Sequence, residues 1–125
     1  MKILKTLFLC TIVMVYGWLG TWALLLPQSF AAAVDLHILS ALGSAEIRAI
    51  YGGLNTMIAI LAAIVLFRKS FQTAFFGGFS LYLMGILLGR VFSVFVGEMQ
   101  GLAVIGFTAF EVFFCSVCIY FYKKG

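Results

Sequence analysis

Four long apolar segments dominate the chain, and short polar stretches separate them. Their approximate ranges are 6–26, 44–67, 71–96 and 102–122. Each is long enough to cross a hydrocarbon core of about 30 Å as a helix that rises about 1.5 Å per residue. No stretch between them is polar enough to form the surface of a soluble domain. We therefore expect an all-α integral membrane four-helix bundle that forms one transmembrane domain over residues 1–125.

The connection between the first two segments, residues 27–43, has an apolar pattern of its own. Apolar residues recur there every four positions, which is the spacing of one helix face. We expect a short amphipathic helix on the membrane surface that ends at Gly43, with Ser44 as the N-cap of the second spanning helix. The alternative is an ordered loop packed over the bundle. The recurring residues are Phe30, Val34, Ile38 and Leu42.

The start of the chain resembles a secretory signal peptide, because two lysines precede an apolar run. The run from Thr6 to Leu26 has the length of a spanning helix, about 20 residues, whereas the apolar part of a signal peptide usually has about 7–15. We therefore expect an uncleaved helix, which Pro27 ends. Trp18 and Trp22 near its outer end fit an interfacial aromatic belt.

Composition and charge agree with a membrane location. Of the 125 residues, 65% are hydrophobic and only 10% are charged, whereas soluble domains are about 25% charged. The net charge of +4 comes from basic residues at the ends of apolar segments, so we expect no nucleic-acid binding. The positive-inside rule places all three basic clusters, and therefore both termini, in the cytoplasm. The clusters are Lys2 with Lys5, Arg68 with Lys69, and Lys123 with Lys124.

Charged residues inside or at the edge of the apolar segments are the strongest functional signal. A charge near the bilayer centre costs at least about 2.5–3.5 kcal/mol on insertion scales and is usually paired or functional. Counting from the outer helix ends, Arg48 lies about 6 Å deep, Arg90 about 10 Å and Glu111 about 14 Å. Arginine side chains extend several Å along a helix, so we expect Arg90 to reach Glu111. Glu46 and Glu98 lie nearer the outer surface.

Helical spacing gives three of the segments a polar stripe in the outer half of the membrane. Residues three, four or seven apart share a helix face, and lipid cannot satisfy their polar groups. We therefore expect a polar pocket between the second, third and fourth segments, open to the outer side. The alternative is a charge network that only fixes helix register. The expected ligand-binding residues are Arg48, Tyr51, Asn55, Arg90, Ser93 and Glu111, with Glu46 and Glu98 at the rim.

The charges of this pocket indicate the ligand. Arg48, Arg90 and Glu111 sum to +1, and two arginines can clamp a phosphate or carboxylate. Apolar walls suit an acyl chain. We expect an anionic lipid or amphiphile, bound in support of envelope and membrane homeostasis, so the expected partners are membrane lipids. Two alternatives stay open. One is an accessory or structural subunit that contacts a second copy or another membrane protein, and the other is a proton-coupled transporter that uses Glu111.

Glycines in the spanning segments indicate close helix packing, either inside the bundle or between protomers. Gly85 and Gly89 form a G-x-x-x-G in the third segment, and Gly52 and Gly53 lie near the start of the second. The small-residue face of the second segment comprises Gly52, Thr56, Ala59 and Ala63.

No recognisable catalytic set occurs in the sequence. Cys115 and Cys118 form a C-x-x-C on an expected spanning helix, where packing is the ordinary role. His37 is the single histidine, and a zinc site normally needs three or four ligands. We expect no enzyme activity, no metal and no cofactor.

Two short motifs resemble the signature of a family of small four-helix bacterial membrane proteins. They are Arg48-Ala49-Ile50-Tyr51-Gly52-Gly53 and Gly89-Arg90. The family is catalogued as domain-of-unknown-function family 4345, and the resemblance covers nearly the whole chain. It implies an inner-membrane protein with four spanning helices, and it carries over no activity. The motif residues are also those that the depth argument selects, which favours the pocket over a register-only network.

Overall fold

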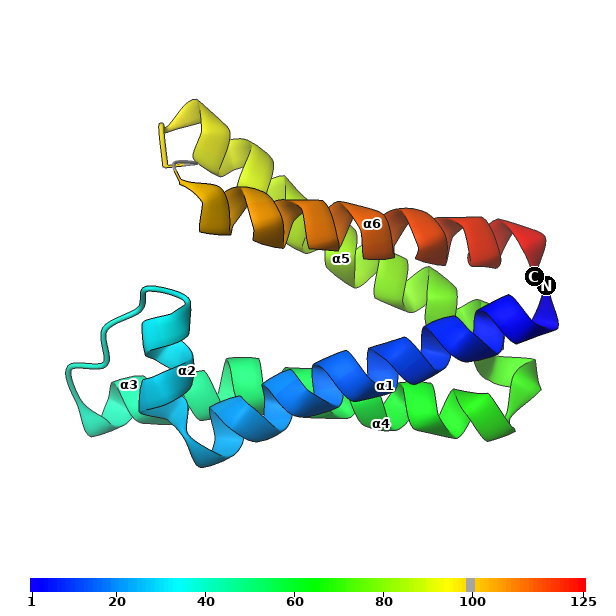
Figure 1. Cartoon of the computed structure of the whole chain (residues 1–125), viewed down its shortest axis with the longest axis horizontal. Coiled ribbons are helices and arrows are strands. Elements are labelled where there is room, and N and C mark those ends of the chain that lie inside the picture. The colour runs from blue at the N-terminus through cyan, green and yellow to red at the C-terminus, as the bar shows by residue number, and fades with distance from the viewer. Residues whose placement is uncertain (99–100) are drawn as a thin grey trace. The chain divides into compact units, whose positions relative to one another are not determined.

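A computed structural model describes residues 1–98 and 101–125 (Figure 1). All regular structure in these residues is helical, which confirms the all-α fold class. The chain is a multi-pass membrane protein by the length and composition of its helices. It divides into two compact units, residues 1–69 and 70–125. The four described stretches able to cross a membrane are Lys2–Leu25, Ala41–Phe67, Lys69–Phe95 and Leu102–Lys124.

The first unit is an antiparallel helix pair with a short helix in its connection (Figure 1). Helix α1 (Lys2–Leu25) packs along η1 (Ile47–Gly53) and α4 (Leu54–Phe67). The connection holds α2 (Pro27–Ala33), and α3 (Ala41–Glu46) forms the start of the second spanning helix. Segment η1 is a π-helix, and it joins α3 to α4 without a break in the helical chain.

Small residues let α1 approach the second helix of this unit closely. A Cβ atom added at Gly20 would lie 2.6 Å from the backbone nitrogen of Thr56. One added at Gly52 would lie 2.8 Å from Cγ of Leu24. The small-residue face expected on the second segment therefore packs against α1. The pairs along this seam are Gly17 with Ala59, Gly20 with Thr56, and Leu24 with Gly52.

The helix expected in the first connection is present but shorter than the range 27–43. Helix α2 ends after Ala33, and Asp35 then adopts a left-handed φ of 58°. The N–H of Leu36 donates to the carbonyl oxygen of Ala31 at 2.7 Å, which completes a Schellman ending. Asp tolerates a left-handed conformation better than most residues. The apolar periodicity of residues 27–43 does not show that the helix ends here.

The second spanning helix begins earlier than expected. Its N-cap is Ser40 and not Ser44, because the Ser40 Oγ accepts the N–H of Gly43 at 3.3 Å. Gly43 consequently lies inside α3 and does not end the preceding helix. Both serines satisfy the N-cap preference, and Ser40 also has the extended backbone that an N-cap needs, with φ −155° and ψ 170°.

The apolar residues of the connection pack onto the rest of the first unit. Phe30 is buried against residues of α1 and η1, and Val34 and Ile38 are partly buried against the same cluster. Leu42, the fourth residue of the pattern, is 70% exposed. The connection is therefore a short helix followed by an ordered packed segment. The buried members of the cluster are Ala23, Phe30, Ala31 and Ile47.

The second unit is the antiparallel pair of α5 (Gln72–Phe95) and α6 (Leu102–Lys124), which the short 3₁₀ turn η2 (Lys69–Phe71) precedes (Figure 1). Aromatic rings fill much of its interior, as in the contact of Phe76 with Phe121, whose ring centroids lie 5.2 Å apart. The two helices therefore pack through large side chains, in contrast to the glycine seam of the first unit.

The cysteines of the C-x-x-C motif belong to this packing. Cys115 and Cys118 are free and buried. The Cys115 thiol donates to the carbonyl oxygen of Ser80 on α5 at 3.7 Å. Both therefore act as small packing residues, as the sequence predicts.

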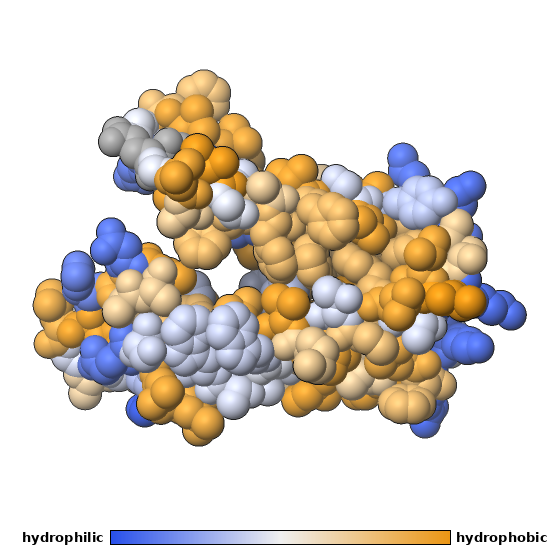
Figure 2. All heavy atoms as spheres, in the orientation of Figure 1, coloured by the Kyte–Doolittle hydropathy of each residue, from blue (hydrophilic) through white to orange (hydrophobic). Residues whose placement is uncertain are grey.

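On the face that Figure 2 shows, apolar side chains cover much of both helix pairs, and the most hydrophilic ones lie at the ends of the helices. Leu88, Phe95 and Phe113 are examples of large apolar side chains that are more than half exposed. Exposed apolar surface of this extent marks contact with a membrane or with other proteins.

Candidate functional site

The six residues expected to bind a ligand divide between the two units. Arg48, Tyr51 and Asn55 lie in the first unit, and Arg90, Ser93 and Glu111 lie in the second. The two expected rim residues are both exposed: Glu46 ends α3, and Glu98 follows the end of α5. Each unit therefore has a polar group of its own.

In the second unit, Arg90 on α5 and Glu111 on α6 form an ion pair with two hydrogen bonds. Arg90 Nε donates to Oε2 at 3.1 Å, and Arg90 Nη2 donates to Oε1 at 2.8 Å. The side chains are 32% and 12% exposed. This geometry occupies one edge of the guanidinium and both carboxylate oxygens. The expected pairing of Arg90 with Glu111 is confirmed.

Ser93 makes its hydrogen bond within α5. Its Oγ donates to the carbonyl oxygen of Gly89, one turn earlier, at 3.0 Å. Thr108 on α6 does the same to Val104 at 2.8 Å. Back-bonding of this kind is the usual way for a hydroxyl to be satisfied inside a helix. The hydroxyl proton of Ser93 is therefore already used.

In the first unit, Arg48 extends from η1 to the end of α1. Its Nε donates to the carbonyl oxygen of Leu24 at 3.0 Å. Leu24 is among the last residues of α1, whose carbonyls have no partner in their own helix. The bond caps α1, and the positive charge suits the negative end of the helix dipole. Arg48 is exposed, and no other residue of the described part of the chain bonds to its guanidinium.

Two residues of the π-helical segment η1, Arg48 and Gly52, both contact Leu24 near the end of α1. Arg48 bonds to the backbone of Leu24, and Gly52 lies against the Leu24 side chain. A side chain at position 52 would prevent this approach, since its Cβ would lie 2.8 Å from Leu24 Cγ. π-Helical turns are rare and occur frequently at functional sites. The end of α1 is therefore the best-supported candidate site.

Tyr51 starts a series of aromatic contacts from η1 to α1. Its ring centroid lies 5.3 Å from that of Phe30 on α2, which in turn lies 5.4 Å from Trp22. Trp22 stacks on Trp18 at 5.1 Å. The Trp22 Nε1 also donates to the Ser29 Oγ at 3.1 Å. These contacts fix the Trp22 indole at the end of α1.

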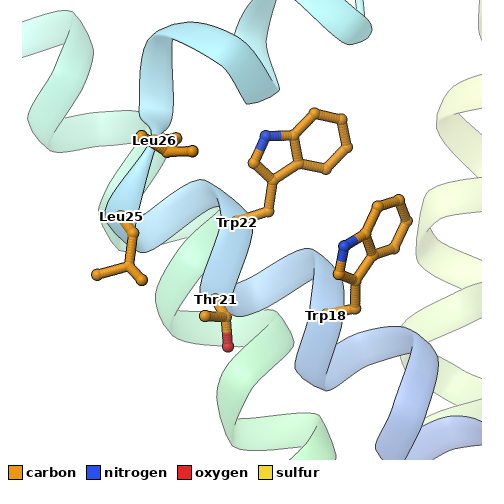
Figure 3. A pocket seen from close by; sticks show the side chains of 5 residues that line it. All are labelled: Trp18, Thr21, Trp22, Leu25 and Leu26. Atoms are coloured by element: carbon orange, nitrogen blue, oxygen red, sulfur yellow. The ribbon is translucent and has the colours of Figure 1, made fainter.

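An open groove of about 290 Å³ follows the last turns of α1 (Figure 3). Figure 3 shows the two indoles on the same side of the helix, with Leu26 at the turn where α1 ends. The sequence predicts an aromatic belt at this place but not a groove. Pro27 is the available signal, because a proline stops the helix there. The groove is lined by Trp18, Thr21, Trp22, Leu25 and Leu26.

Comparison with protein families identifies the chain. A family model described as Domain of unknown function (DUF4345) matches residues 3–122. The chain belongs to this family. No match was found among curated proteins or among solved structures.

The glycines of this DUF4345 chain differ in their surroundings. Gly52 lies against Leu24, as described above. Among the described residues, a Cβ at Gly53 would meet only the carbonyl oxygen of Arg48, at 3.7 Å. A Cβ at Gly85 or Gly89 would meet nothing within 4 Å among the described residues. Gly52 is thus the member of this set that sits at a close helix approach.

Buried polar groups also occur along α4 of this DUF4345 chain. Asn55 is only 9% exposed. The Thr56 Oγ is buried and has no hydrogen-bond partner in the described residues, and it faces the backbone of Gly20 across the seam. These two groups lie about two helical turns beyond Arg48.

Proposed function

We propose that this protein binds an anionic lipid or amphiphile through Arg48, in the outer half of a bacterial inner membrane. The observation that carries the proposal is that most hydrogen-bond donors of the Arg48 side chain have no acceptor among the described residues. One N–H is fixed by Leu24 O at 3.0 Å, and the remaining guanidinium N–H groups face no acceptor among the described residues. An unpaired charge in a spanning segment is costly, and a phosphate or carboxylate supplies both the countercharge and the acceptor oxygens.

The other charged residues support Arg48 as the anion contact. Arg90 and Glu111 neutralise each other through two hydrogen bonds, so we assign them the task of fixing the register of α5 and α6. The same pairing favours a structural role for Glu111 over that of a proton carrier. Tyr51 and Asn55, on the helix that carries Arg48, remain the candidates for further polar contacts.

The distribution of basic residues supports an orientation with both termini in the cytoplasm. In the first unit, α1 starts with Lys2 and Lys5, and the antiparallel α4 is followed by Arg68 and Lys69 (Figure 1). These basic residues therefore share one end of the helix pair, and Arg48 belongs to the opposite half. We accordingly assign the lipid to the outer leaflet, and we assign the protein to envelope and membrane homeostasis.

Thermal unfolding with added lipid tests the anion contact. A ligand that binds only the native state raises the Tm by an amount that grows with its concentration. We expect a short-chain phosphatidylglycerol to raise the Tm of the wild type in detergent and a matched phosphatidylcholine to do so far less. In Arg48→Gln, phosphatidylglycerol should raise the Tm no more than phosphatidylcholine does. Lys124→Gln, which removes a positive charge at the C-terminal end of α6 in the second unit, should keep the difference between the two lipids. Equal shifts for wild type and Arg48→Gln contradict the proposal.

A second candidate function is that of a non-catalytic subunit of a larger membrane complex. Gly78, Gly85 and Gly89 share one face of α5, and a Cβ at any of them would meet nothing within 4 Å among the described residues. Small-residue faces accept a second membrane helix. Co-purification of a stoichiometric protein that Gly85→Leu displaces favours this function. A second copy of the chain displaced in the same way favours a homo-oligomer.

A further inference from the structure

We infer that the groove lined by Trp18, Thr21, Trp22, Leu25 and Leu26 holds an acyl chain of the lipid whose anionic group Arg48 binds. The inference rests on the proposed function and narrows its ligand. The ligand must then be an anionic amphiphile with an extended hydrocarbon chain. A free phosphate or a bare headgroup would contact Arg48 and leave the groove empty.

The groove and the anion contact meet at the end of α1. Arg48 donates to the carbonyl oxygen of Leu24, and the next two residues, Leu25 and Leu26, line the groove. Tyr51, three residues after Arg48, connects to the groove through Phe30 and Trp22. The anion contact and the groove therefore share the end of α1, and Phe30 of α2 lies between Tyr51 and Trp22.

The direction of the groove matches that of a lipid in a membrane. From Leu26 back to Trp18 the groove extends over eight residues, or about 12 Å along the helix axis. Helix α1 is long and apolar enough to span the membrane, so this path runs inward from the surface. A headgroup at Arg48 then lies near the surface, and its chain extends past Trp22 towards Trp18.

The walls of the groove suit a hydrocarbon chain. Trp18 is 63% exposed, and Leu25 and Leu26 are also largely exposed. Trp22 is held by the hydrogen bond to Ser29 and by the edge-on contact with Phe30. A ligand therefore meets a wall whose central indole is already fixed, which reduces the entropy lost on binding. Sites for apolar ligands typically combine such walls with a few placed polar groups.

Tryptophan fluorescence tests the inference directly, because the chain contains two tryptophans and both line the groove. The protein is placed in phosphatidylcholine nanodiscs that contain a small fraction of lipid with brominated acyl chains, which quench indoles on contact. We expect brominated phosphatidylglycerol to quench the wild type several-fold more than the same fraction of brominated phosphatidylcholine. Arg48→Gln should abolish this excess, and Lys124→Gln should retain it.

A second variant separates the groove from the anion contact. Leu25→Gln places a polar group in the groove and leaves Arg48 unchanged, so it should lower the excess quenching while the Tm shift with short-chain phosphatidylglycerol persists. Circular dichroism establishes that each variant is folded. Equal quenching of the wild type by the two brominated lipids overturns the inference. If the Arg48-dependent Tm shift persists in that case, only the acyl-chain site is wrong; if the shift is also absent, the proposed function fails as well.

Discussion

The Nε of Arg48 donates a hydrogen bond to the carbonyl oxygen of Leu24 at 3.0 Å and so joins the π-helical segment to the end of α1. The bond satisfies a carbonyl that the helix itself leaves without a partner. It also fixes the direction of the guanidinium while most of its donors stay available to a ligand. One contact therefore serves both the fold of the first unit and its proposed binding site.

Removing this bond should destabilise the protein even without lipid. Hydrogen bonds to charged groups contribute about 1.5–3 kcal/mol, and the exposure of Arg48 favours the lower part of that range. We expect Arg48→Gln to lower the free energy of unfolding by about 1–2 kcal/mol. Arg48→Lys keeps the charge near the helix end and should lose less. Thermal unfolding in lipid-free detergent measures both, and an unchanged Tm for Arg48→Gln contradicts the capping role.

The seam between α1 and α4 should be intolerant of added volume. A Cβ at Gly20 would lie 2.6 Å from the Thr56 backbone nitrogen, and a backbone atom cannot move aside as a side chain can. Overpacking of this kind costs about 1–3 kcal/mol, so Gly20→Ala should lower the Tm clearly. Gly78→Ala is the matched control, because its Cβ would meet nothing within 4 Å in the described chain. Similar Tm values for the two variants would show that the seam is not closely packed.

The Arg90–Glu111 pair should show strong coupling in a double-mutant cycle. Glu111→Leu leaves the Arg90 charge without the Glu111 carboxylate in a spanning segment, at a cost of about 2.5–3.5 kcal/mol. Arg90→Met is the other single variant of the cycle. The double variant Arg90→Met/Glu111→Leu removes both charges and should recover most of that loss. Ser116→Ala, whose hydroxyl bonds to Val112 within α6 at 2.8 Å, is the control and should be nearly neutral. Additive effects of the single changes on unfolding would argue against the pair.

The helix cap at the start of α3 distinguishes two serines that are similar in sequence. The Ser40 Oγ accepts the N–H of Gly43 at 3.3 Å, so Ser40→Ala should destabilise this helix by about 1 kcal/mol. Ser44→Ala should have little effect, because Ser44 lies inside α3. Hydrogen exchange of the amides in α3 and η1 measures the difference. Faster exchange in Ser44→Ala than in Ser40→Ala would favour the cap expected from the sequence.

Much of the fold follows from the apolar pattern, since membrane helices must satisfy their own backbone groups. The spanning segments and the short helix of the first connection are therefore predictable. The end of α2 is not, because it depends on one left-handed residue, Asp35. Nor is the π-helical turn of η1 predictable, because the residues Ile47–Gly53 have no pattern that distinguishes π-helical from α-helical spacing.

The candidate site was only partly predictable for a similar reason. The depth count identifies Arg48, Arg90 and Glu111 as important, and the pairing of Arg90 with Glu111 follows from it. The depth count does not predict the partner of Arg48. This partner is the backbone carbonyl of Leu24, which is available only because α1 ends there. The groove beside Trp22 lies where α1 ends, and the identity of the tryptophans does not reveal it.

Native mass spectrometry of the protein extracted in mild detergent shows whether Arg48 holds an anionic lipid, with Arg48→Gln and Lys124→Gln measured beside the wild type. We expect the wild type and Lys124→Gln to retain an anionic lipid that Arg48→Gln has lost. Equal amounts of the same lipid on all three proteins, or no retained lipid on the wild type, would contradict the proposal.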